Sequence, residues 1–128
     1  MTSKILVLHD QSEEITALID KLQAYGYTIE SATTPEEVLE KAKGTHPNLF
    51  IGSGNFADAN LPAIAEQIYD KYKVPAYLVL KSAGDDTEAR MIRHPGIIGV
   101  YFSPVNVDRL FGRVRKFCQM LESPQAGS

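Results

Sequence analysis

The sequence predicts an α/β fold in which a five-stranded parallel sheet carries helices on both faces. Short apolar runs recur along the chain, and segments with the apolar spacing of amphipathic helices separate them. Strands that alternate with helices build parallel β-α-β units with right-handed crossovers. The length of 128 residues suits one domain. We expect that domain over residues 1–122 and a linker or disordered tail over residues 123–128.

The strands are predicted from apolar runs that are too short for helices. The first run, Ile5 to Leu8, is continuously apolar, as expected of a strand that is buried on both faces. The third is followed by Gly52, Ser53 and Gly54, which predict a loop directly after residue 51. We expect strands at residues 5–8, 27–32, 49–51, 76–80 and 97–102.

The helices are predicted from apolar spacing and from capping signals. Thr34 is a good N-cap, Pro35 suits the first helical position, and Glu37 completes a capping box. Gly26 and Gly44 stand where helix ends favour glycine. We expect helices between Ser12 and Gly26, between Thr34 and Gly44, and at residues 62–72, 87–92 and 107–121.

Composition and charge exclude several classes of function. The net charge of −3 and the pI of about 5.6 argue against a nucleic-acid-binding surface. A late basic cluster is more typical of a solvated helix face than of a phosphate site; it comprises Arg109, Arg113, Arg115 and Lys116. No apolar run is long enough for a membrane span. The lone cysteine, Cys118, fits a reducing compartment, so we expect a cytoplasmic protein.

Polar residues follow the predicted strands at one edge of the sheet. In open parallel sheets the working crevice lies at the carboxyl ends of the strands. This places the following residues around one crevice: His9, Asp10, Ser53, Lys81, Ser82 and Ser103.

From Lys4 to about Leu121 the chain resembles the response-regulator receiver family. Residues 4–10 resemble the family's first strand with its acidic pair, residues 47–53 its third strand, and residues 74–79 its fourth. Residues 101–104, with the helix that follows, resemble its fifth strand and last helix. No single segment is specific, but their order and spacing are. The resemblance implies a flavodoxin-like doubly wound sheet in the order 2-1-3-4-5, of which receiver domains are a standard example.

The positions that carry phosphoryl transfer in this family are altered here. The family uses three acidic groups around Mg²⁺, one of them the nucleophile, with a hydroxyl after the fourth strand and a lysine after the fifth. These positions hold His9, Asp10, Ser53, Leu80 and Ser103. The single carboxylate of Asp10 binds a cation weakly at best, and Ser53 is a weak nucleophile without an evident base. The resemblance therefore implies a vestigial phosphorylation site, with no catalytic residue, metal or cofactor.

Three nearby residues leave alternatives open. Ser82 can replace the missing hydroxyl if its loop shifts, and Lys81 can replace the missing lysine. Asp58, in the loop after the third strand, is an alternative phosphoacceptor. A solvated loop aspartate is the preferred interpretation of Asp58, and Lys81 is equally well explained as a solvated lysine.

We expect a non-phosphorylatable receiver-like signalling domain, not an enzyme, that acts by protein–protein interaction. It would be a module of a larger bacterial regulatory protein in two-component signal transduction. The resemblance implies an interaction face on the fourth helix, fifth strand and last helix, with candidates Tyr101, Arg109, Phe111 and Arg113. A homodimer is an alternative that the sequence leaves open. No direct contact with nucleic acid or membrane is expected. The alternatives are an atypical phosphoacceptor that uses Asp58 or Ser53, and a small-ligand sensor in the vacated crevice.

Overall fold

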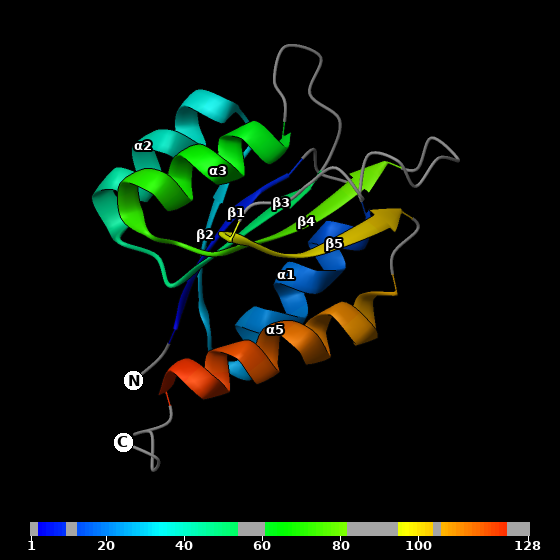
Figure 1. The fold of residues 1–128 in the computed structure, drawn as a ribbon. Helices are drawn as coiled ribbons and strands as arrows, with labels where there is room; N and C mark the ends of the chain where they lie inside the picture. The colour runs from blue at the N-terminus through cyan, green and yellow to red at the C-terminus, as the bar shows by residue number, and fades with distance from the viewer. Residues whose placement is uncertain (1–2, 10–12, 54–60, 82–94, 104–105, 123–128) are drawn as a thin grey trace.

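The strands of the protein form one parallel sheet, in the order β2-β1-β3-β4-β5 (Figure 1). A computed structural model describes residues 3–9, 13–53, 61–81, 95–103 and 106–122. The strands are β1 (Lys4–Leu8), β2 (Thr28–Ala32), β3 (Leu49–Ser53), β4 (Ala76–Lys81) and β5 (Ile97–Ser103). The helices within these ranges are α1 (Glu13–Tyr25), α2 (Pro35–Thr45), α3 (Leu61–Tyr72) and α5 (Val107–Glu122). The predicted fold class and strand order are confirmed.

The sheet is the middle of three layers. Helices α1 and α5 cover one face, and α2 and α3 cover the other (Figure 1). The packing of β1 explains why residues 5–8 are all apolar. Leu6 and Leu8 join the core under α2 and α3, whereas Ile5 and Val7 join the core under α1 and α5. Both faces of the strand are therefore buried, as its continuous apolar run predicts.

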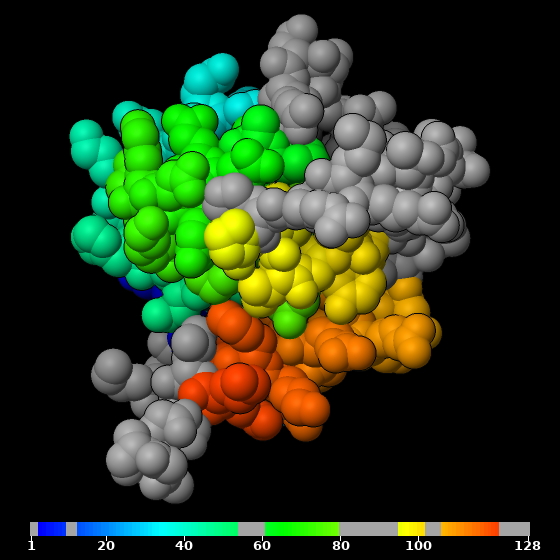
Figure 2. Space-filling view, viewed as in Figure 1, coloured from blue at the N-terminus to red at the C-terminus, as the bar shows by residue number. Residues whose placement is uncertain are grey.

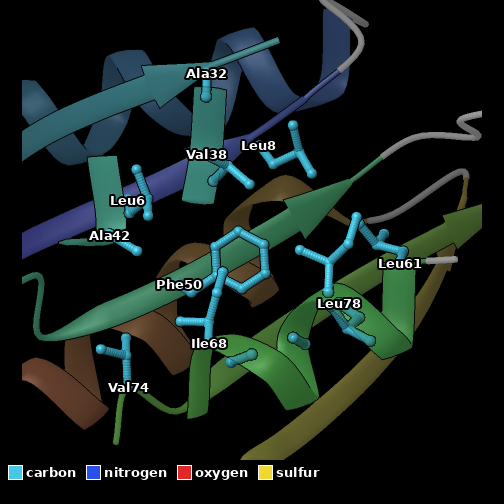
Figure 3. Close-up of a cluster of buried hydrophobic side chains, with 13 residues drawn as sticks. Leu6, Leu8, Ala32, Val38, Ala42, Phe50, Leu61, Ile68, Val74 and Leu78 are labelled. Atoms are coloured by element: carbon cyan, nitrogen blue, oxygen red, sulfur yellow. The ribbon is translucent and has the colours of Figure 1, made fainter. Parts of the chain in front are cut away.

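Phe50 of β3 lies in the core between the sheet and helices α2 and α3. Its side chain is fully buried. In Figure 3 the ring points into a space that Val38 and Ala42 of α2 and Ile68 of α3 enclose, with Leu78 of β4 beside it. This packing joins α2, α3 and two central strands in one apolar cluster.

The third strand is longer than its sequence predicts. The expectation that Gly52 and Ser53 belong to a loop is wrong, because both lie in β3. Gly52 pairs with Leu8 of β1 and with Leu78 of β4, so strand pairing on both sides overrides the low strand propensity of glycine. A Cβ atom at Gly52 would lie 3.0 Å from Cδ1 of Leu61, the first residue of α3. The small residue therefore lets α3 begin close to the sheet.

Helix α2 follows most of its predicted capping pattern. The backbone N–H of Glu37 donates to Oγ1 of Thr34 (3.1 Å), as predicted. In return, Oε1 of Glu37 accepts from the N–H of Thr33 (3.0 Å) rather than from that of Thr34. The predicted end at Gly44 is wrong: the helix continues to Thr45, and His46 is the left-handed C-cap, with φ of 50°.

Two hydrogen bonds at Thr45 explain why α2 continues past Gly44. The Thr45 hydroxyl donates to the carbonyl oxygen of Lys41 (2.7 Å), and Lys4 Nζ donates to the carbonyl oxygen of Thr45 (3.1 Å). The carbonyl group of Thr45 lies at the end of the helix and lacks an intrahelical donor, so the bond from Lys4 satisfies it. The bond to Lys41 fixes the Thr45 side chain against the preceding turn. In contrast, α1 ends as predicted, with Gly26 at φ 112°.

Several predictions fall on residues whose structure is not described. These are the N-cap at Ser12, the helix at residues 87–92 and the tail at residues 123–128. Among the helices that are described, none is both long enough and apolar enough to cross a membrane.

Candidate functional site

His9 and Ser53 lie at the carboxyl ends of the two central strands β1 and β3. Leu8 of β1 pairs with Gly52 of β3, and the two strands are parallel. The residues that follow, His9 and Ser53, therefore lie next to each other. The N–H of His9 also donates to the carbonyl oxygen of Ala32 (3.0 Å), which extends the pairing of β1 with β2. Both side chains are buried, with 9% of His9 and 4% of Ser53 exposed.

The other predicted residues of the vestigial site follow along the same edge of the sheet. Leu80 of β4 pairs with Phe102 of β5, and Lys81 pairs with Ser103. The strand order therefore places His9, Ser53, Lys81 and Ser103 successively along this edge. Asp10, Asp58 and Ser82 lie outside the described residues.

The described part of this edge offers few ligands to a divalent cation. The described residues that end β1, β3, β4 and β5 include no aspartate or glutamate. Within the described ranges, no three His, Cys, Asp or Glu side chains come together as a metal site. Mg²⁺ sites are built from carboxylate oxygens and phosphate oxygens, so the acidic set that Mg²⁺ requires is missing from this part of the edge.

A second distinctive feature is the pairing of β4 with the edge strand β5. Ala76 pairs with Ile97 but Tyr77 pairs with Gly99, so Ile98 is an extra residue in β5, a β-bulge. The Ile98 side chain is 40% exposed, although it is apolar. Bulges at sheet edges redirect side chains, which explains an exposed isoleucine in a strand whose other described side chains are partly buried.

The ring of Tyr77 lies across Gly99. A Cβ atom at Gly99 would approach Cδ1 of Tyr77 to 2.6 Å, which no real side chain tolerates. Tyr77 also contacts Tyr101, with ring centroids 6.1 Å apart, and Phe117 of α5, edge to face at 6.3 Å. Glycine is thus required for α5, β4 and β5 to share one aromatic cluster. This contact is not predicted by the sequence pattern.

Burial raises the pKa of the Tyr77 hydroxyl above its ordinary value. The neighbouring Tyr101 raises this pKa further, the positive charge of Arg113 lowers it, and Cys118 raises it. The positive charge of Arg113 on α5 therefore acts electrostatically on Tyr77 of β4. Tyr77 thus stays protonated to higher pH in the folded protein than in the unfolded chain.

Replacing Tyr77 by phenylalanine is expected to reduce the loss of stability at alkaline pH. The unfolded chain releases the tyrosine proton first, because folding raises this pKa. The linked stability is fully present below about pH 10, the unfolded pKa, and is lost as the pH rises through the folded pKa. Urea unfolding of both proteins from about pH 8 to pH 11 checks this. Equal slopes of stability against pH would contradict it.

The four predicted interaction residues do not share one surface. Arg109 and Arg113 are exposed on α5, and Tyr101 of β5 is partly buried beside Tyr77. Phe111 instead faces α1: its ring meets that of Tyr25 edge to face at 5.9 Å. The predicted interaction face is therefore divided, with Phe111 on the α1 side and the other three toward β5. The helical repeat indicates this division already in the sequence, because residues two positions apart on a helix, such as Arg109 and Phe111, point in nearly opposite directions.

Charged side chains reinforce the contact between α1 and α5. Lys21 Nζ lies 3.0 Å from Oδ1 of Asp108 and 5.9 Å from the ring centroid of Phe111. The guanidinium of Arg115 lies 5.2 Å from the ring centroid of Tyr25. Of the late basic cluster, Arg115 therefore serves the interface between the two helices.

Comparison with known proteins relates the chain to receiver domains by fold. No protein-family model matches it, and no curated protein gives a significant match. A CheY-like receiver domain from Methanospirillum hungatei JF-1 matches with a TM-score of 0.77 at 19% identity, over 95% of this chain and 98% of that one. A putative response regulator from Chloroflexus aurantiacus matches with a TM-score of 0.77 at 18% identity, over 91% and 97%.

The chemotaxis response regulator CheY4 of Vibrio cholerae matches with a TM-score of 0.69 at 20% identity, over 91% of this chain and 98% of that one. These matches cover nearly the whole of each chain, while sequence identity is low. The comparison therefore concerns architecture: the chain has the fold of the CheY-like receiver domains of signalling proteins.

Proposed function

We propose that this chain is a receiver-like signalling domain that does not accept a phosphoryl group and acts by binding a protein partner. The observation that carries the proposal is the edge formed by the strand ends. His9, Ser53 and Ser103 occupy it, whereas the resemblance to receiver domains calls for an acidic residue, the aspartate nucleophile and a lysine. The fold is kept, but the groups that carry the reaction are replaced.

The properties of Ser53 support this proposal. A serine hydroxyl needs a neighbouring base to act as a nucleophile at neutral pH, and its burial here limits access by a phosphodonor. Ser103 cannot supply the positive charge with which a lysine would stabilise a transferred phosphoryl group. Leu80 likewise has no hydroxyl to offer. Each replacement removes a different part of the reaction.

The remaining parts of the proposal concern context. We place the domain in the cytoplasm, as a module of a larger bacterial regulatory protein in two-component signalling. Cys118 is buried and is the single cysteine of the sequence, which is consistent with a reducing compartment. Partner binding is assigned to the side of α5 that faces β5, where Tyr101, Arg109 and Arg113 lie.

Incubation with acetyl phosphate and Mg²⁺ is expected to leave the intact mass of the protein unchanged. The physical reason is the absence of an aspartate at position 53 and of a lysine at position 103. A receiver domain that retains all five family residues, treated in the same mixture, is the positive control. A gain of one phosphoryl group, mapped by fragmentation to Ser53 or Asp58, would overturn the proposal and favour an atypical phosphoacceptor.

A further inference from the structure

Helix α5 carries an exposed cationic stripe on the side that faces β5. The stripe consists of Arg109, Arg113 and Lys116, with Met120 continuing the same line. These residues are spaced i, i+4, i+7 and i+11, which places them on one side of a helix. All four are exposed, and Met120 is 63% exposed, although it is apolar.

The charges of the cationic stripe are not neutralised within the described part of the chain. The ion pairs found there join Lys21 to Asp108, and Lys41 to Glu30 and Glu37. None of them involves the stripe. Arg115, the remaining basic residue of α5, turns to the opposite side and stacks on Tyr25. As far as the described residues are concerned, the stripe thus keeps three positive charges, in a protein whose net charge is −3.

An exposed apolar residue of β5 lies near the end of the stripe. Tyr77 pairs with Gly99 and contacts Phe117, so the bulge residue Ile98 lies level with the last turns of α5. Figure 2 shows β5 (yellow) at the surface, directly beside α5 (orange to red). Exposed Met120 of α5 and exposed Ile98 of the neighbouring strand β5 therefore accompany the three cations where these two elements border each other.

We propose that the cationic stripe binds an acidic, amphipathic segment of the partner protein, with Met120 and Ile98 receiving its apolar side chains. This inference rests on the proposed function and specifies the chemistry of the partner. Complementary charge across an interface speeds association and excludes wrong partners. Apolar contacts at the same surface supply the desolvated centre that charge alone does not.

A symmetric dimer through the stripe is disfavoured by the same charges. A two-fold contact brings the same patch of both copies together, so Arg109, Arg113 and Lys116 would face their own like charges. Like charges set against each other at an interface oppose association. The structure therefore favours a different, acidic chain over a second copy as the occupant.

The test titrates the labelled domain with a synthetic helical peptide that has glutamates on one face and leucines on the other. We expect NMR shift changes centred on Arg109, Arg113, Lys116, Met120 and Ile98. Binding should weaken as salt is added, because the charges are exposed. The double variant Arg113→Glu/Lys116→Glu should bind about tenfold more weakly or worse, since reversed charges repel the peptide.

The matched control is Lys43→Glu/Lys71→Glu, which makes the same change of net charge on α2 and α3, at exposed sites away from the stripe. It should bind the peptide as the parent does. Equal loss in both variants, or no binding by the parent, would overturn the proposal. Circular dichroism spectra of both variants verify that they are folded.

Two further outcomes would assign the stripe to another occupant and overturn the proposal. One is sedimentation that shows self-association of the parent but not of the stripe variant. The other is a DNA duplex that displaces the peptide. The acetyl phosphate experiment tests the proposed function separately: phosphorylation of the domain would refute that function, whereas a failed peptide titration refutes only the acidic partner.

Discussion

Replacing Phe50 by alanine is expected to lower the free energy of unfolding by about 3–5 kcal/mol. The Phe50 side chain is fully buried and packs in the cluster that joins α2 and α3 to the sheet (Figure 3). Its removal loses apolar burial and leaves a cavity that β3, paired on both sides, cannot close by moving. Urea unfolding followed by circular dichroism measures the change.

Ile51→Val is the matched control for Phe50→Ala. Ile51 is the next residue of the same strand and is equally buried, but it lies in the cluster under α1 and α5. Loss of one methylene there should cost only about 0.5–1.5 kcal/mol. If Phe50→Ala were no more destabilising than Ile51→Val, the Phe50 ring could not be packed as described.

Gly99→Ala is expected to destabilise the protein by about 1–3 kcal/mol, the usual cost of forcing extra atoms into a packed region. The new methyl carbon would lie 2.6 Å from Cδ1 and 2.7 Å from Cε1 of Tyr77. These ring atoms cannot yield freely, because Phe117 and Tyr101 contact the same ring. The measurement is the midpoint of thermal or urea unfolding.

A double-mutant cycle isolates the contact behind this effect. In the Tyr77→Ala background, Gly99→Ala should lower the free energy of unfolding much less, because the ring that the new methyl group would contact is absent. The effects of substitutions at two contacting residues are non-additive in this way. Gly112→Ala in α5 is the control: nothing lies within 4 Å of its Cβ position, and alanine favours a helix by about 0.5–1 kcal/mol. If the losses of unfolding free energy caused by Tyr77→Ala and Gly99→Ala are additive, the Tyr77 ring is not the cause of the destabilisation by Gly99→Ala.

Two features of this protein were determined by its sequence alone. The alternation of apolar runs with amphipathic segments was sufficient for the fold class, because strands that are buried on both faces show continuous apolar runs, as residues 5–8 of β1 and 49–51 of β3 do. The presence of serine at positions 53 and 103, where the resemblance calls for an aspartate and a lysine, could also be read from the sequence. Residue identity at a strand end needs no coordinates once the strands are located and the resemblance to receiver domains is recognised.

Other features were decided only by tertiary structure, because they depend on contacts between residues distant in sequence. Gly52 belongs to β3 since neighbouring strands pair with it on both sides. Gly99 is required because the bulge at Ile98 brings it under the Tyr77 ring. The late basic residues looked alike in sequence, but the packing of α5 against α1 separates Arg115, stacked on Tyr25, from the exposed cationic stripe. Local propensity contains no information on such pairings, since each is set by which elements meet across the sheet.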